Sequence, residues 1–245
     1  MTADALSALF AELGRLAGLD RVEIELRRRG YVRVAGLDEA GRGPLAGPVV
    51  AAAVVLPEGC VLPGLDDSKK LDAETRTALD REIRVRAVAI GVGIVGPAVI
   101  DVDNVLQASL AAMRQAIGAI APPPDALVLD AVRVPGVRLP QVPIVHGDAL
   151  SSSVAAASIV AKVHRDALCE DMARRYPVYG FEKHKGYGTP EHLEALGRVG
   201  PCEIHRRSFY PVGVFFQTDL FAERWSAMAV PLRVRSYRRV LRKRT

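Results

Sequence analysis

Hydrophobic positions follow two different periods along this chain. A spacing of three and four residues, typical of helices with one buried face, covers 4–17, 73–86, 98–120, 151–176 and, in a shorter stretch, 190–197. Short apolar runs rich in Val, Ile and Ala predict buried strands over 32–37, 48–56, 87–95, 126–130 and 142–145. Two strands come first in hairpin style, and later strands alternate with helices. This order predicts an α/β fold, a mixed sheet covered by helices.

Local signals give the boundaries of these elements. Asp72 is expected to cap a helix that carries Glu74 in its first turn, and Gly18 is expected to end the first helix. A second short helix is expected over 22–29, before a Gly. We divide the chain into three parts, which are a helical N-terminal segment, a main domain and a helical, basic C-terminal extension, over 1–30, 31–212 and 213–245. The first part docks on the main domain, helps to grip nucleic acid, or is a solvated capping helix.

Composition narrows the class of protein. The 245 residues carry a formal net charge of +5, which favours a polyanionic partner. Three scattered cysteines without a C-x-x-C pair indicate neither a disulfide framework nor a zinc site, and they fit a reducing cytosol. Prolines and glycines interrupt every long apolar stretch, so no transmembrane helix is predicted. The start of the sequence lacks the basic region of a signal peptide. We therefore expect a cytoplasmic protein that does not contact a membrane.

Two adjacent carboxylates, Asp38 and Glu39, stand at the end of the first apolar strand, directly before Gly41 and Gly43. A strand places neighbouring side chains on opposite faces, but a twist or bulge near the glycines would let both reach one site. Adjacent carboxylates in apolar surroundings repel unless a cation compensates them, and a hard divalent metal ion prefers oxygen ligands. The alternative is a polar turn that closes a hairpin.

Two further carboxylates lie in comparable places. Asp130 ends another apolar strand, and Asp148 follows a strand and Gly147. Because ends of neighbouring strands can converge, four carboxylates could hold two Mg²⁺ or Mn²⁺ ions. Alternatively, Asp130 caps a turn and Asp148 is the N-cap of the following helix.

Two phosphate-binding motifs are disfavoured at the glycine loop. The glycines at 41, 43 and 47 approach a dinucleotide-binding fingerprint, but the residues that follow predict a strand where that motif requires a helix. No Gly-Lys-Ser/Thr follows, which argues against a P-loop.

Six strings resemble, in order and spacing, the motifs of bacterial ribonuclease HII. The first, over 34–49, contains Leu-Asp-Glu-Ala-Gly-Arg-Gly-Pro, and the second is Asp-Ser-Lys-Lys-Leu over 67–71. Asp130 stands where that family carries its third carboxylate. The remaining strings are Gly-Asp at 147–148, Ala-Ala-Ala-Ser-Ile-Val-Ala-Lys-Val over 155–163 with Arg-Asp at 165–166, His-Lys-Gly-Tyr-Gly-Thr over 184–189 and His-Arg-Arg-Ser-Phe over 205–209.

This resemblance implies an RNase H-like fold and an endonuclease that cleaves the RNA strand of RNA–DNA hybrids. It also implies incision 5′ of ribonucleotides embedded in duplex DNA, leaving 5′-phosphate and 3′-hydroxyl ends. The implied catalytic metal ligands, for two Mg²⁺ or Mn²⁺ ions, are Asp38, Glu39, Asp130 and Asp148. The implied substrate contacts are Gly41, Arg42 and Gly43 at the ribose 2′-hydroxyl, Tyr187 at the neighbouring sugar, and Ser68, Lys69, Lys162, His184 and Lys185 near the phosphates. We expect His184 and His205 to be structural or phosphate-facing rather than general bases.

Two other functions compete with this interpretation. Another metal nuclease of the same fold, such as a resolvase or integrase, would not need a loop and Tyr187 that sense a 2′-hydroxyl. A catalytically inert nucleic-acid-binding module would gain nothing from four clustered carboxylates. We expect a monomer, and we expect the basic stretch 233–244 to follow the duplex backbone, with a solvated terminal helix as the alternative.

Overall fold

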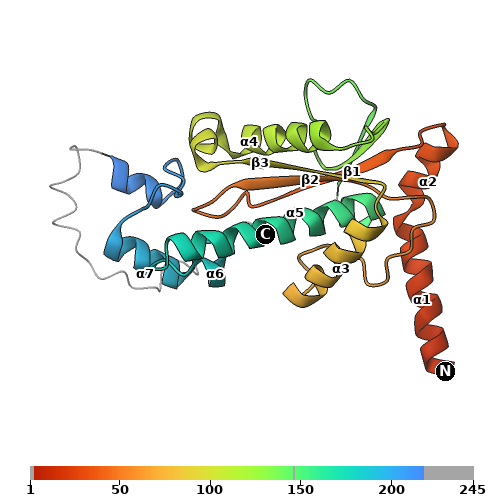
Figure 1. The fold of residues 1–245 in the computed structure, drawn as a ribbon, viewed down its shortest axis with the longest axis horizontal. Coiled ribbons are helices and arrows are strands. Elements are labelled where there is room, and N and C mark those ends of the chain that lie inside the picture. The colour runs from red at the N-terminus through yellow and green to blue at the C-terminus, as the bar shows by residue number, and fades with distance from the viewer. Residues whose placement is uncertain (1–2, 146, 218–245) are drawn as a thin grey trace.

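The computed structural model describes residues 3–145 and 147–217, with Asp148 described in its backbone alone. Five strands form one mixed sheet in the spatial order β3-β2-β1-β4-β5 (Figure 1). The strands are β1 Val34–Ala40, β2 Val49–Val55, β3 Ala89–Val95, β4 Ala126–Asp130 and β5 Gln141–Ile144. β2 is antiparallel to β1 and β3, whereas β4 is parallel to β1 and β5. The mixed α/β sheet that the hydrophobic pattern predicts is confirmed.

Helices cover both faces of this sheet, α4 on one face and α5 on the other (Figure 1). The helices are α1 Ala3–Leu19, α2 Arg21–Arg28, α3 Ala73–Arg86, α4 Pro97–Ala119, α5 Ser152–Arg175, α6 Phe181–His184 and α7 Pro190–Val199. Two 3₁₀ turns, η1 Gly147–Ala149 and η2 Val212–Phe216, complete the description. Among the helices within 3–217, none has the length and apolar character needed to cross a membrane.

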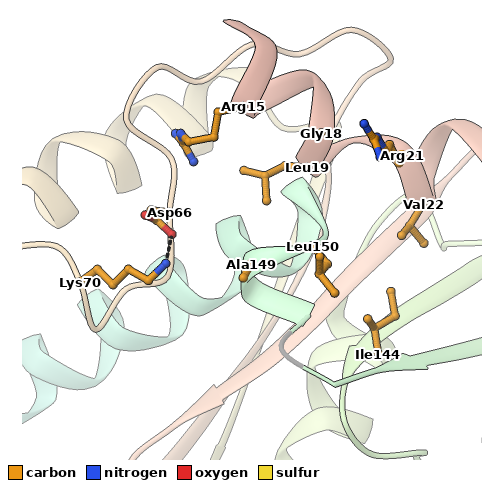
Figure 2. A pocket seen from close by; sticks show the side chains of 10 residues that line it. All are labelled: Arg15, Gly18, Leu19, Arg21, Val22, Asp66, Lys70, Ile144, Ala149 and Leu150. Atoms are coloured by element: carbon orange, nitrogen blue, oxygen red, sulfur yellow. Dashed lines mark hydrogen bonds and ion pairs between the residues drawn. The ribbon is translucent and has the colours of Figure 1, made fainter. Parts of the chain in front are cut away.

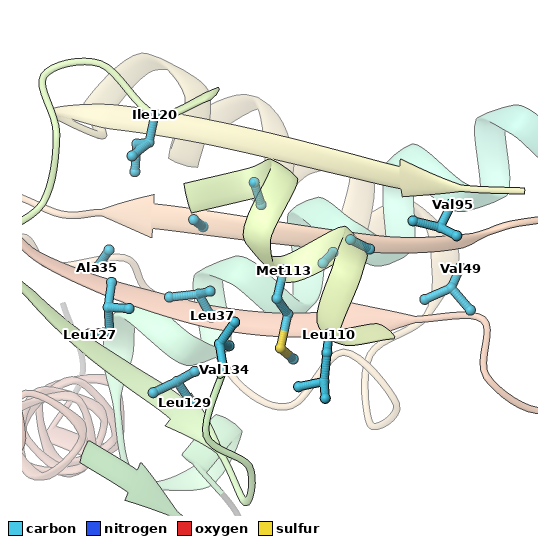
Figure 3. Packing of buried hydrophobic residues seen from close by; sticks show 14 of the residues in the cluster. Ala35, Leu37, Val49, Val95, Leu110, Met113, Ile120, Leu127, Leu129 and Val134 are labelled. Atoms are coloured by element: carbon cyan, nitrogen blue, oxygen red, sulfur yellow. The ribbon is translucent and has the colours of Figure 1, made fainter. Parts of the chain in front are cut away.

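The alternation of side chains along the strands divides the core into two layers. Leu37 of β1 and Leu129 of β4 pack with Met113 of α4, as Figure 3 shows. Residues of the opposite parity, such as Val54 of β2, pack with Ile159 of α5. Burying one such aliphatic side chain contributes about 1.5–3 kcal/mol, so these two layers fix which face each strand residue occupies.

Gly36 lets α5 approach β1 closely. A Cβ atom at this position would lie 2.0 Å from the carbonyl carbon of Ser153 in the first turn of α5. Any side chain would therefore push the helix away from the strand. The close approach brings the start of α5, and the turn η1 before it, to the strand that carries Asp38.

The N-terminal helices α1 and α2 are attached to the start of α5. Glu23 of α2 is fully buried, and its Oε1 accepts hydrogen bonds from Ser151 Oγ (2.5 Å), the Ser153 amide (3.0 Å) and Ser153 Oγ. Asp20 Oδ1 accepts another from Ser152 Oγ at 2.9 Å. Segment 1–30 is therefore attached to the N-terminus of α5, which is a contact that hydrophobic periodicity alone does not indicate.

Most predicted elements are present, with three differences. Gly18 does not end α1, because Leu19 packs in the core and the helix continues to it. The helix after Asp148 is capped by Ser151, whose side chain accepts the Val154 amide, and not by Asp148. The short helix α6 was not predicted. Within the predicted extension 213–245 only residues to 217 are described, so the helix expected there and the basic stretch 233–244 lie outside the described residues.

Candidate active site

Asp38 and Asp130 lie side by side at the carboxyl ends of the neighbouring strands β1 and β4. The last paired residues of the parallel strands β1 and β4 are Leu37 and Leu129, and each aspartate follows directly. Both have the parity of Gly36, which faces α5, so both project toward that helix. Asp38 is buried, and its Oδ1 accepts the Glu39 amide at 2.7 Å. Asp130 Oδ1 accepts the Gly147 amide at 2.9 Å.

Glu39 occupies the alternate parity of β1. Its pairing with Ala51 of β2 continues the regular antiparallel register through Ala40, so the bulge considered from the sequence is absent between these two described strands. Glu39 Oε1 instead accepts a hydrogen bond from Arg42 Nη1 at 3.1 Å. The two adjacent carboxylates therefore leave the strand in opposite directions, and only Asp38 shares the face of Asp130.

The negative charge at these strand ends is only partly balanced by nearby cations. Burial raises the pKa of Asp38 well above its ordinary value, and repulsion from Glu39 and then from Asp130 adds to the effect, while Lys69 opposes it. Burial also raises the pKa of Glu39 against the attraction of Arg42. Carboxylates held in this way are stabilised by an added cation, and a set of oxygen donors alone suits Mg²⁺ or Mn²⁺.

Asp148 belongs to the turn η1, whose first residue, Gly147, is bonded to Asp130. The Ser151 amide donates to the Gly147 carbonyl oxygen at 2.8 Å and links this turn to α5. Among the side chains that the structure describes, which omit that of Asp148, no group of three or more His, Cys, Asp or Glu is arranged to hold a metal ion. The backbone of η1 thus lies next to Asp130, and the turn joins that strand end to the start of α5.

Two buried arginines hold the glycine loop that follows β1. Arg206 donates to the carbonyl oxygens of Gly41 (2.6 Å), Arg42 (2.8 Å) and Gly47 (3.0 Å). Arg165 donates to the carbonyl oxygen of Pro48 at 3.2 Å. Gly41 has φ +94°, and a Cβ atom there would lie 2.0 Å from Arg165 Nε, so this position requires glycine.

Sequence reasoning did not assign a role to either arginine. Both belong to strings that carried the family resemblance, but a charged residue in a motif does not reveal that it is buried. Burial, and then the charge of Arg165, lowers the pKa of Arg206 to about 9. One signal in the sequence could have indicated them. A tight loop of Gly and Pro leaves several carbonyl oxygens without strand partners, and these oxygens need donors from elsewhere in the chain.

Tyr187 lies beside this loop with 46% of its surface exposed. A Cβ atom on Gly43 would lie 3.4 Å from Tyr187 Cε1, and the Leu45 amide donates to the Gly186 carbonyl oxygen at 2.8 Å. The structure thus brings together two segments that are more than a hundred residues apart in the sequence. The expected partners in 2′-hydroxyl sensing, Gly43 and Tyr187, are neighbours in space.

The predicted phosphate-binding cations are all engaged with carboxylates. Lys69 Nζ lies 3.5 Å from Asp67 Oδ1, Lys162 Nζ lies 2.5 Å from Asp166 Oδ1, and Lys185 pairs with Glu170. The Ser68 side chain is buried, and its amide donates to Ser158 Oγ at 3.2 Å. Lysine pairs at the surface are weak and can exchange a carboxylate for a phosphate.

His184 does not fit its predicted contact with substrate. The residue is 9% exposed, its Nδ1 accepts the Gly186 amide at 3.2 Å, and its Nε2 bonds the Tyr179 carbonyl oxygen at 2.7 Å. Both ring nitrogens are thus used by the backbone, which argues against a contact of this ring with phosphate. His205 is likewise buried, and whether either histidine faces a phosphate stays a prediction.

A pocket separates the N-terminal helices from the loop that carries Lys69. Figure 2 shows its lining, in which Arg15 and Arg21 come from the helices and Asp66 and Lys70 from the loop. Lys70 Nζ lies 2.9 Å from Asp66 Oδ1. Ala149 of η1, with Leu150 and Ile144, completes the wall, so α1 and α2 lie close to the turn that carries Asp148.

The comparisons of this chain with known proteins all point to one family. The sequence model of the family Ribonuclease HII matches residues 35–212. The Ribonuclease HII of Geobacillus kaustophilus is 57% identical over 194 residues, which are 79% of this chain and 74% of that protein. That of Desulfitobacterium hafniense is 51% identical over 205 residues, 84% of this chain and 79% of that protein. The crystal structure of ribonuclease H2 from Pyrococcus horikoshii superposes with a TM-score of 0.63 at 27% identity, covering 75% of this chain and 96% of that one.

Proposed function

The chain belongs to the ribonuclease HII family, and we propose that it uses divalent metal ions to cleave the RNA strand of RNA–DNA hybrids and to incise duplex DNA at single embedded ribonucleotides. Membership makes it a hydrolase, a nuclease of the ribonuclease H type. The observation that supports the finer proposal is the pair of neighbouring carboxylates, buried Asp38 and partly buried Asp130, beside the loop of Gly41–Gly43.

The metal ions would be held by Asp38, Glu39, Asp130 and Asp148. Bound Mg²⁺ or Mn²⁺ supplies an activated water and stabilises charge on the leaving 3′-oxygen. The protein's own part is to fix the ligands. Strand register holds Asp38 against Asp130, and the Gly147 amide orients the Asp130 carboxylate. Glu39 reaches this site by a change of side-chain direction from its present bond to Arg42.

The loop of Gly41, Arg42 and Gly43 would recognise the ribose. Arg206 occupies the carbonyl oxygens of Gly41 and Arg42, so the amide N–H groups of this loop are what it offers to a 2′-hydroxyl oxygen. A glycine backbone has no side chain to prevent close approach of a sugar. The loop would thereby distinguish a ribonucleotide from a deoxyribonucleotide at the cut.

Tyr187 would test the next sugar. Its exposed ring lies beside Gly43, where it can pack on a deoxyribose that follows the ribonucleotide. Lys69, Lys162 and Lys185 would bind the flanking phosphates, which positions the duplex without reading its sequence. The products would be a 5′-phosphate and a 3′-hydroxyl.

Cleavage of a duplex with one ribonucleotide, beside an all-DNA duplex of the same sequence, tests this proposal. We expect one incision, 5′ of the ribonucleotide, in Mg²⁺ or Mn²⁺ and none in EDTA, with both product ends identified by mass spectrometry. A long RNA–DNA hybrid serves as a second substrate. Cleavage of the all-DNA control, or incision that persists in EDTA, would contradict the proposal.

A further inference from the structure

Three buried histidines lie together beneath the segment that carries Tyr187. His192 and His205 are 0% and 1% exposed, and their Nε2 atoms are 3.0 Å apart. The rings of His184 and His192 stack with centroids 4.4 Å apart and planes inclined by 10°. The family motifs contain two of these residues, but the function proposed above uses none of them.

Backbone partners at both ends fix the proton on each ring of the pair. The Cys202 amide can only donate, so His205 Nδ1 accepts at 3.0 Å and the proton of His205 lies on Nε2. The Tyr187 carbonyl oxygen can only accept, so His192 Nδ1 donates to it at 2.9 Å. His192 Nε2 is then an acceptor, and it meets the one donor that faces it, His205 Nε2–H.

The hydrogen bonds therefore run in one direction, from the Cys202 amide through His205 and His192 to the Tyr187 carbonyl. A second proton on either ring would place two donors against each other. Burial lowers the pKa of both histidines to about 4, which agrees with neutral rings.

His184 fixes the same backbone from its other side. Its Nδ1 accepts the Gly186 amide at 3.2 Å, so its Nε2–H donates to the Tyr179 carbonyl oxygen at 2.7 Å. The Tyr187 amide donates to the His184 carbonyl oxygen at 2.9 Å. Both peptide groups that flank Tyr187 are thus held by histidine residues, although the tyrosine ring itself is exposed.

We infer that His192 and His205 are positioning residues for Tyr187, and that their oriented hydrogen bonds set the preference for a lone ribonucleotide over a long hybrid. This inference rests on the proposed function of Tyr187. The ring can discriminate sugars only if its backbone is fixed, and His192 Nδ1 makes the single side-chain bond that the structure gives to the Tyr187 carbonyl oxygen. A displacement of about 1 Å at such a position is enough to change rates substantially.

Substitution of His192 tests this role. His192→Phe keeps an aromatic ring in the stack and removes both nitrogens, whereas His192→Asn keeps an amide N–H near the position of Nδ1. We expect the ratio of kcat/KM for the lone ribonucleotide to that for the long hybrid to fall about tenfold in His192→Phe. We expect His192→Asn to restore part of the ratio, and His164→Phe, a histidine of α5 outside the cluster, to leave it unchanged.

A double substitution distinguishes an effect of His192 that acts through Tyr187 from a general effect of His192 on catalysis. If His192 acts through Tyr187, His192→Phe changes the ratio no further in a chain that already carries Tyr187→Ala. Equal loss on both substrates, or an unchanged ratio in His192→Phe, would overturn the inference. Absence of lone-ribonucleotide incision by the wild-type chain would instead overturn the proposed function.

The wild-type protein provides a test that needs no variant to fold. In ¹⁵N–¹H spectra of the histidine rings near neutral pH, we expect His192 with its proton on Nδ1 and His184 and His205 with theirs on Nε2. The opposite tautomer at His192, or a doubly protonated ring at His192 or His205, would contradict the direction of the hydrogen bonds and the inference with it.

Discussion

The carboxylates Asp38 and Asp130 are adjacent to the glycine loop that Arg206 holds. The two regions balance buried charge in opposite ways. Arg206 finds three carbonyl oxygens within 3.0 Å, and the loop residues it holds have no further need of a partner there. Asp38 is also buried, but it accepts one backbone amide, and the charges of Glu39 and Asp130 repel it more than Lys69 attracts it. The chain itself supplies partners for the loop, whereas the carboxylates would gain one from the cation proposed above.

This difference distinguishes a structural charge from a functional one. A buried charge whose partners all come from the chain stabilises one conformation, and its removal leaves polar groups unsatisfied. A buried charge without a partner raises the free energy of the folded chain and is retained where a ligand supplies the partner. The following predictions test the comparison, from the largest expected effect to the smallest.

Asp130→Asn should abolish most activity while hybrid binding survives. The amide keeps the shape of the carboxylate but removes a charged metal ligand and reduces repulsion of phosphate. A metal ion stabilises the transition state by several kcal/mol, which corresponds to a loss of at least about 100-fold. Cleavage and binding are measured separately at saturating Mg²⁺, with the surface substitution Asp171→Asn as control. Turnover at the wild-type rate would refute the assignment.

Arg206→Ala should destabilise the fold by about 3–5 kcal/mol, because it leaves three carbonyl oxygens without this donor, and those of Gly41 and Gly47 are buried. The neighbouring Arg207 is exposed and lies over the Phe216 ring, so Arg207→Ala is the matched control, with an expected effect below about 1 kcal/mol. Urea unfolding measures both values. Equal stability of the two variants would show that the loop is held by other means.

Divalent metal should stabilise the wild-type fold without substrate. At a concentration about 100 times the dissociation constant, the gain is about 2.7 kcal/mol. Thermal unfolding with Mg²⁺ and with EDTA measures it, and we expect a smaller gain in Asp130→Asn. If Mg²⁺ stabilised the variant as much as the wild type, the ion would bind elsewhere.

Acid should destabilise the histidine cluster. The pKa of His192 and of His205 is about 4 in the folded chain against an ordinary value of 6.5, so between these values the unfolded chain binds more protons. The free energy of unfolding then decreases as pH falls, by up to about 1.4 kcal/mol per pH unit for each histidine. Unfolding of wild type and His192→Phe from about pH 7 to about pH 5 isolates this contribution. Parallel curves would show that the rings are not held neutral.

Hydrophobic periodicity was sufficient for most elements of this fold. Asp72 caps α3 as expected, and the strands β1 to β5 follow the apolar runs, because burial of alternate or successive residues decides secondary structure locally. The end of α1 was misplaced by one residue, since Leu19 belongs to a core cluster that includes residues of β2, α3 and α5, far from it in the chain. The short helix α6 has too few residues for a period to appear.

The sequence by itself determined the donor atoms and the family, because motifs specify residue types and their order. Only the tertiary structure decided which of these residues meet. Strand register set Asp38 against Asp130 and turned Glu39 away, and burial made Arg165 and Arg206 supports of the glycine loop. Burial also placed the ring of His184 in a stack with that of His192. Register and burial depend on contacts between residues far apart in the chain, and no local pattern of residue types contains them.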